Sequence, residues 1–316
     1  MKKTLIFLYT CLVLAAAAGL WFNRNGTYLA ERSLWKLSRE YDAIVNNTTG
    51  TPTQNYVFLL EKLDKFIRRY SPHRVVSVGY ILRGRLLTVQ GKYALARQEF
   101  DEALDMFAGQ EALVVQLLLE EAQMYALAGD HQGVTDTYDR IISEHALTPH
   151  GMQGPLILAK YFVQKREAAR AKEAYIAAID HYRRLIEKYP DSQVEFQSRL
   201  LLAESFKFLE DWDKVLELHK ETLLKFAAPE FWNRQSLLYV IQSINSATIL
   251  RNKDFTTPVA IYSEFIQKYP NHPFNDDLTE YIRRIQYMEA RTRETGAPVD
   301  ASALEGAPVL EGAPAP

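Results

Sequence analysis

Six segments of this chain end in a similar way at intervals of about forty residues, and this repeat constrains the fold more than any other feature. Residues 66–70, 185–189 and 265–269 each read apolar, Ile, polar, basic, Tyr, and a proline follows within two residues. Proline lacks the amide that a helix needs to continue, so the pattern predicts helix ends. Three further helix ends are predicted from a less complete pattern. The six predicted ends lie at Tyr70, Phe107, His145, Tyr189, Phe226 and Tyr269. This spacing accommodates two helices and two turns per repeat.

The interior of the repeat has a matching register. Small residues at Gly84, Ala122 and Ala203 are followed three residues later by a large side chain and seven residues later by a turn. Residues three or four apart share one helix face, so a small residue admits a second helix and the large residue fills the adjoining groove. The residues expected to pack the helices together are Tyr80, Gly84, Leu87, Ala96, Phe100, Ala103, Ala122, Tyr125, Tyr138, Tyr182, Ala203 and Phe206.

The composition supports a chain built of helices alone. Proline and glycine are scarce between residues 28 and 290, and no extended alternation of β-branched residues predicts a strand. The formal net charge of −2 provides no basic field for nucleic acid. Cys11 is the single cysteine of the chain, which excludes a disulfide framework and a Cys-based metal site.

This register resembles that of the tetratricopeptide repeat (TPR) family, whose helices carry small–x–x–aromatic and Ala–x–x–x–aromatic–x–x–Ala patterns. The best match is formed by Tyr80, Gly84, Leu87, Ala96, Phe100 and Ala103, and a second by Ala178, Tyr182, Leu185 and Pro190. The resemblance covers residues 28–290 and implies an all-α solenoid of five to six helical hairpins. The repeats are longer than is usual in the family: Glu167–Lys188 adds two turns, and Pro258 stands where a small residue is expected.

Both ends of the chain differ in composition from the repeats. Residues 1–23 begin Met1-Lys2-Lys3 and are apolar from Leu5 to Phe22, which predicts either a cleaved export signal or an uncleaved membrane anchor. A lipoprotein signal ending at Cys11 is a third option. The two lysines favour a cytoplasmic N-terminus and a domain on the far, periplasmic side. Residues 295–316 are rich in Ala, Gly and Pro, and we expect a disordered tail there.

The Tyr-Pro ends, the N-terminal segment and the opening helix 30–37 are similar to those of bacterial cell-envelope TPR proteins. These proteins include the outer-membrane assembly lipoprotein and the periplasmic TPR partner of the Tol-Pal system. The resemblance implies a non-catalytic scaffold that binds other envelope proteins, with no nucleic acid and no cofactor. Three alternatives stay open: a structural subunit of an assembly or secretion complex, an adaptor at the inner face of the membrane, and a cell-wall enzyme with a helical superhelix.

No catalytic or nucleotide-binding motif is present in the sequence, so we do not expect an enzyme. His145 and His150 flank a Thr-Pro turn, but no carboxylate cluster supports a metal there. The paired acids Glu120 and Glu121 are adjacent in sequence and are expected on a solvated helix face or at a helix start.

The concave face of such an array is the candidate binding surface. The first helix of each repeat lines this face. On each of these helices, we expect the residue directly after the small residue to face the groove. The expected groove residues are Arg85, Gln123, Glu204, Lys207 and Phe208. They mix both signs of charge and predict a partner surface of mixed polarity. They do not reproduce the Lys and Asn clamp with which some TPR proteins hold a peptide carboxylate.

Overall fold

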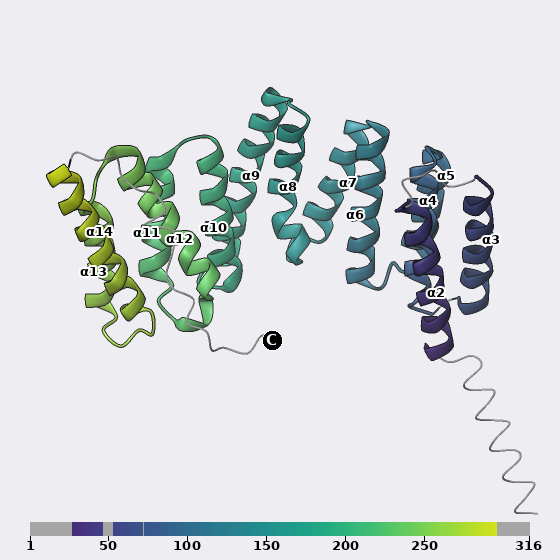
Figure 1. The fold of residues 1–316 in the computed structure, drawn as a ribbon, viewed down its shortest axis with the longest axis horizontal. Helices are drawn as coiled ribbons and strands as arrows, with labels where there is room; N and C mark the ends of the chain where they lie inside the picture. The colour runs from purple at the N-terminus through teal and green to yellow at the C-terminus, as the bar shows by residue number, and fades with distance from the viewer. Residues whose placement is uncertain (1–26, 47–52, 72, 296–316) are drawn as a thin grey trace, which may run out of the picture. The chain divides into compact units, whose positions relative to one another are not determined.

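The computed structural model describes residues 27–46, 53–71 and 73–295. These residues form thirteen α-helices, one 3-10 turn and one π-helical segment, and include no strand (Figure 1). The elements are α2 (Thr27–Val45), α3 (Thr53–Tyr70), α4 (Val76–Val89), α5 (Tyr93–Met106), α6 (Glu111–Ala128), α7 (His131–Glu144), α8 (Pro149–Gln164), α9 (Ala168–Lys188), α10 (Gln193–Phe208), α11 (Trp212–Lys225), η1 (Pro229–Phe231), α12 (Arg234–Asn245), η2 (Ser246–Leu250), α13 (Thr256–Lys268) and α14 (Asn275–Thr295). The prediction of an all-helical chain is confirmed for this part of the protein.

The predicted N-terminal segment 1–23 and the predicted tail from Gly296 onward lie outside the described residues. Thr295, expected as the first tail residue, is instead the last residue of α14. The helical part therefore continues beyond the expected limit at residue 290.

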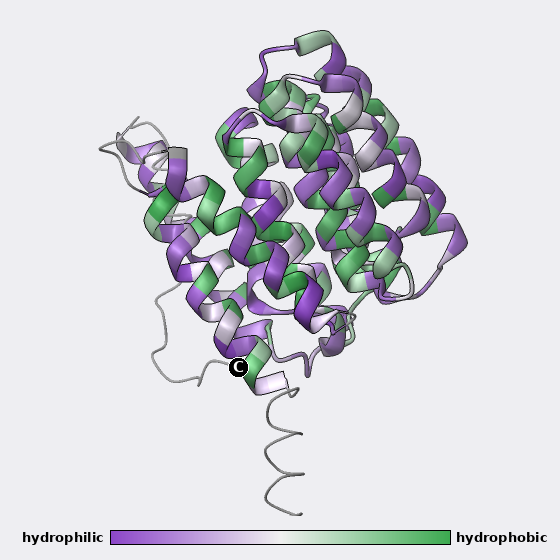
Figure 2. Cartoon of the chain, turned by 90° about the vertical axis from the view of Figure 1, so that its right-hand side faces the viewer, coloured by the Kyte–Doolittle hydropathy of each residue, from purple (hydrophilic) through white to green (hydrophobic). Residues whose placement is uncertain are grey.

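The chain divides into two compact units between Gly154 and Pro155. The boundary falls within α8, at a proline that cannot donate the backbone hydrogen bond of an internal helix position. In the first unit, one hydrophobic core joins buried side chains from α2 to α7. In the second unit, one cluster joins the end of α8 to α9, α10 and α11, and another joins α10 to α14. Along the helices, apolar and polar stretches alternate, as expected where one stripe is buried (Figure 2).

Consecutive helices pack as hairpins. In the first unit α2 packs along α3, α4 along α5 and α6 along α7, and the first helices of successive hairpins, α2, α4 and α6, also touch in order. In the second unit α10 packs along both α9 and α11, and α13 along α14. All six expected helix ends coincide with observed ones, since Tyr70 ends α3 and the other five residues directly follow the last residues of α5, α7, α9, α11 and α13.

The turns inside the hairpins share one geometry. A residue with positive φ reverses the chain at Gly91, Gly129, Arg166 and Glu210. The next amide then donates to the carbonyl five residues back, as Lys92 does to Leu87 over 2.9 Å. This is the Schellman closure of a helix end. A fifth turn of this kind has Lys253 at positive φ. Here the amide of Asp254 donates to the carbonyl six residues back, at Thr248, because the π-helical segment η2 adds one residue to the end of the preceding helix.

Most of the twelve residues expected to pack the helices together are buried. Ten are buried, and Tyr125 and Tyr138 are half-buried. Phe100 lies against the α-carbon of Gly84, where a Cβ atom would overlap the ring. The small residue therefore permits the close approach of α4 and α5.

Candidate partner-binding groove

Three of the five predicted groove residues line one surface cavity in the second unit. Glu204, Lys207 and Phe208 come from the last turns of α10, and the volume of the cavity is about 430 Å³. The remaining lining residues are Lys160, Val163 and Gln164 from the end of α8, and Tyr175 from α9. We call this cavity, with these seven lining residues, the α8–α10 groove.

An aromatic stack forms one side of the α8–α10 groove. The rings of Tyr175 and Phe208 are nearly parallel, with an interplanar angle of 16° and centroids 3.8 Å apart. Tyr175 is buried, whereas 41% of the Phe208 surface is exposed. Val163, on the neighbouring helix α8, is also an exposed large apolar residue. The stack therefore gives the exposed Phe208 ring a packed partner on one face while its remaining apolar surface faces solvent.

Charged groups also line the α8–α10 groove. The Glu204 carboxylate accepts a hydrogen bond of 2.8 Å from the hydroxyl of Tyr239 on α12. The ammonium groups of Lys160 and Lys207 lie 3.7 and 3.9 Å from the same carboxylate, beyond a normal hydrogen bond. Both lysines are substantially exposed, so their donors stay open to solvent or to a bound partner.

Tyr239, the partner of Glu204, and His219, which packs against Tyr239, are both uncharged. Burial, and then the charge of Glu204, raise the pKa of Tyr239, so its hydroxyl remains a donor. The His219 ring packs edge-on against the Tyr239 ring, with centroids 5.5 Å apart. His219 is fully buried, and burial, with a smaller effect of the Lys207 charge, lowers its pKa to about 3. The imidazole is therefore uncharged near neutral pH.

The other two predicted groove residues belong to the first unit. Arg85 on α4 donates from Nε to Glu120 on α6 over 2.6 Å, and a second guanidinium nitrogen donates to the other carboxylate oxygen. Gln123 is exposed on α6, one turn beyond Glu120. The five predicted residues therefore form two sets, one in each unit.

The expectation that Glu120 and Glu121 lie on a solvated face is wrong, because both are buried. Glu120 is compensated by Arg85, which lies 35 residues earlier in the chain. Glu121 faces a polar cavity of about 280 Å³ beside Arg97, Tyr125 and Arg140. Burial, and then the charge of Asp101, raise the pKa of Glu121.

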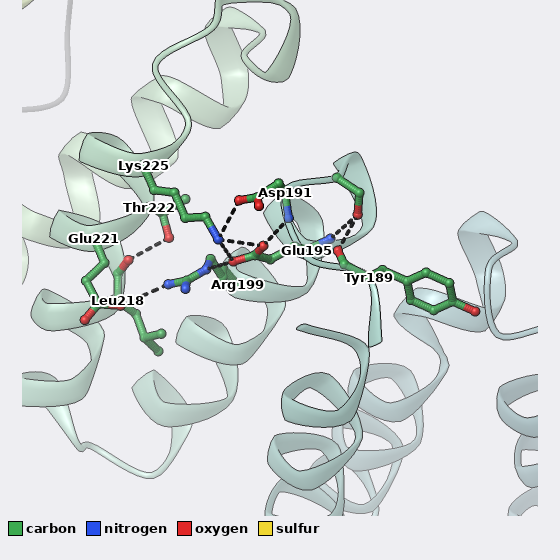
Figure 3. Close-up of polar contacts among 9 residues, drawn as sticks. Tyr189, Asp191, Glu195, Arg199, Leu218, Glu221, Thr222 and Lys225 are labelled. Carbon is green, nitrogen blue, oxygen red and sulfur yellow. Dashed lines mark hydrogen bonds and ion pairs between the residues drawn. The ribbon is translucent and has the colours of Figure 1, made fainter. Parts of the chain in front are cut away.

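A buried acid also joins the turn before α10 to α11 (Figure 3). Glu195, 1% exposed, accepts hydrogen bonds from the Asp191 amide, Arg199 Nε and Lys225 Nζ at 2.7–2.8 Å. Burial opposes the charged form, but the hydrogen bonds from Lys225 and Arg199 outweigh it and lower the pKa of Glu195. Both oxygens of the Glu195 carboxylate are engaged by residues of this chain, so Glu195 stabilises the fold and is not available to a ligand.

Neither a cluster of metal ligands nor a membrane-spanning helix is found in the described ranges. Over residues 27–46, 53–71 and 73–295, no group of three or more His, Cys, Asp and Glu side chains could hold a metal ion. His145 instead lies 3.2 Å from Glu111. None of the helices in the same ranges is long and apolar enough to span a bilayer.

Some groove residues escaped prediction although a signal existed. Ala159, Phe162, Ala171 and Tyr175 repeat the register of Gly84, Leu87, Ala96 and Phe100. Recognising this register would have placed the end of α8 and Tyr175 beside α10. Tyr239 carries no such signal, because it reaches Glu204 from a helix 35 residues away.

The chain matches no protein-family model. A search of curated proteins likewise finds none that resembles it significantly.

Proposed function

We propose that this protein is a TPR-type scaffold of the bacterial cell envelope that binds partner proteins and catalyses no reaction. One observation carries the proposal: the α8–α10 groove places the exposed, stacked ring of Phe208 next to two lysines whose donors are open. An apolar anchor beside charged groups is the arrangement by which rigid helical surfaces hold extended or helical segments.

The proposed mechanism is preorganised binding. Tyr175 holds Phe208 in place, and Tyr239 holds Glu204, so the groove loses little side-chain entropy when a partner binds. The ordering cost then falls mainly on the partner segment. No step of this mechanism requires a cofactor.

Photo-crosslinking in cells tests the proposal. A photoreactive phenylalanine analogue replaces Phe208 or Val163 in the groove, and Leu250 or Tyr287 as controls, which are exposed apolar residues of the same unit outside the groove lining. We expect one recurrent envelope protein to be captured from the groove positions and not from the controls. Equal adducts from both sets, or none from the groove, would exclude the groove as the binding surface.

The envelope location is a separate part of the proposal. It is supported by the apolar run from Leu5 to Phe22 after two lysines. Protease added to intact cells with a permeabilised outer membrane should digest the helical repeats. Full protection until the inner membrane is lysed would instead place the repeats on the cytoplasmic side.

A further inference from the structure

The first hairpin, α2 with α3, exposes an unusual share of large apolar side chains. Of the fifteen such side chains in the described ranges, five belong to this hairpin, which contributes only two of the thirteen helices. They are Tyr28, Trp35, Val45, Val57 and Phe58. Contiguous exposed apolar surface marks a site of interaction, and two of these side chains, Tyr28 and Trp35, share one face of α2.

Two aromatic residues define the outer face of α2. Tyr28 and Trp35 are seven residues apart, so they lie on one side of the helix, and their surfaces are 63% and 58% exposed. Ala30 and Leu37 are the buried residues of α2 and face the core. The aromatic rings therefore point away from the hairpin rather than into it.

Cations flank this aromatic face. Arg32, Lys36 and Arg39 are exposed on α2, and the Arg39 guanidinium lies 5.0 Å from the Trp35 ring centroid. Glu31 and Asp42 are exposed on the opposite flank. Over residues 27–71, seven Lys and Arg residues stand against five Asp and Glu residues, a formal charge of +2, whereas the whole chain carries −2. The hairpin is thus positive within a slightly negative protein.

We propose that the outer face of α2 docks on an anionic lipid surface. Trp and Tyr favour the level of the lipid headgroups, and Lys and Arg nearby are attracted to anionic ones. The position of α2 in the chain also supports docking on lipid, because only four residues separate Thr27 from the apolar run that ends at Phe22. At no more than about 3.5 Å per residue, an anchored run would keep the start of α2 within roughly 20 Å of the bilayer.

Quenching of tryptophan fluorescence by brominated lipid tests this docking in the full chain. The protein is reconstituted in phosphatidylcholine vesicles with or without phosphatidylglycerol, brominated near the headgroup end of the acyl chains. Subtracting the Trp35→Phe spectrum isolates Trp35, and subtracting the Trp212→Phe spectrum isolates Trp212 of the second unit as a control. We expect loss of most Trp35 emission in the anionic vesicles, with Trp212 unaffected.

A charge reversal supplies the second arm. Arg32→Glu, Lys36→Glu and Arg39→Glu together should abolish the quenching of Trp35. The matched variant Lys172→Glu, Arg183→Glu and Lys220→Glu has the same net charge, changes exposed residues of the second unit, and should retain it. Circular dichroism confirms that both variants remain helical.

Three outcomes would overturn the inference. Trp35 emission could stay unquenched, or neutral vesicles could quench it as strongly as anionic ones. Trp35 could also be shielded from a water-soluble quencher in detergent without anionic lipid, which would show that protein covers this face. Crosslinking at Phe208 tests the groove separately, so the result for Trp35 neither supports nor contradicts the proposed function of the groove.

Discussion

Phe100 occupies the space that a side chain at position 84 would require. The ring is buried, and its outer atoms lie where a Cβ on Gly84 would be built. Helices α4 and α5 approach each other through this contact. The glycine is therefore needed for packing rather than for backbone conformation, since it lies inside a regular helix.

Replacing Gly84 by alanine should lower the free energy of unfolding. Overpacking of this kind costs about 1–3 kcal/mol, and the better helix propensity of alanine returns roughly 1 kcal/mol. Urea denaturation measures the difference. Gly109→Ala is the control, because no atom lies within 4 Å of its added Cβ. Adding Phe100→Leu to Gly84→Ala should recover part of the loss, and equal stability of the Gly84 and Gly109 variants would refute the steric account.

The hairpin turns make a prediction of the opposite sign. Arg166, Glu210 and Lys253 have φ of 61°, 59° and 54°, a region that disfavours residues with a Cβ. Each single change to glycine should raise stability by about 0.5–1 kcal/mol, after the extra freedom of the unfolded chain is counted. The matched reverse changes, Gly91→Ala and Gly129→Ala, should lower it by ~1 kcal/mol. Thermal unfolding of all five variants would refute this account if the two groups do not separate.

These turns also show how much of the fold could be read from the sequence. Helix ends are local, and the repeat pattern predicted six of them to within one residue. Arg166 at the turn between α8 and α9 carries no such signal, whereas glycine marks two of the other turns, at Gly91 and Gly129. A turn stabilised by its hydrogen bonds can hold a non-glycine residue at positive φ, and sequence gives little warning of it.

Tertiary partners were harder to foresee. Glu120 was expected in solvent because its neighbours in sequence do not reveal Arg85, which approaches from another helix. The same limit applies to the groove. Helix periodicity placed Glu204, Lys207 and Phe208, but the partners of Glu204 come from α8 and α12. Their positions depend on how successive hairpins pack.

The Glu195 network predicts a loss of stability in acid. The pKa of Glu195 is lowered in the fold, so its ion pairs contribute fully above the unfolded pKa of about 4.3 and are lost as pH falls through the folded pKa. Glu195→Gln should cost about 2–3 kcal/mol at neutral pH, less than a fully buried pair because Lys225 is partly exposed.

Urea unfolding of the wild type and Glu195→Gln from pH 7 down to pH 3 checks this. The two curves should converge as the wild-type carboxyl becomes protonated. Glu221→Gln is the control, since this exposed partner of Arg199 should change stability by less than about 1 kcal/mol. A constant gap between wild type and Glu195→Gln at all pH values would contradict the ion-pair explanation.

His219 predicts a second acid effect, which starts at a higher pH. Its pKa is lowered to about 3 by burial, so between about 6.5 and 3 the unfolded chain binds a proton that the folded protein does not. Stability should therefore fall as pH drops below about 6.5, with a limiting slope near 1.4 kcal/mol per pH unit from this residue.

Neither ring nitrogen of His219 has a hydrogen-bond partner among the described residues. His219→Leu should accordingly retain or raise stability at pH 7 and flatten the profile from pH 6.5 to 5, above the range where Glu195 titrates. His150→Gln, at an exposed site, should leave the profile unchanged. An unaltered slope in His219→Leu would show that the acid sensitivity arises elsewhere.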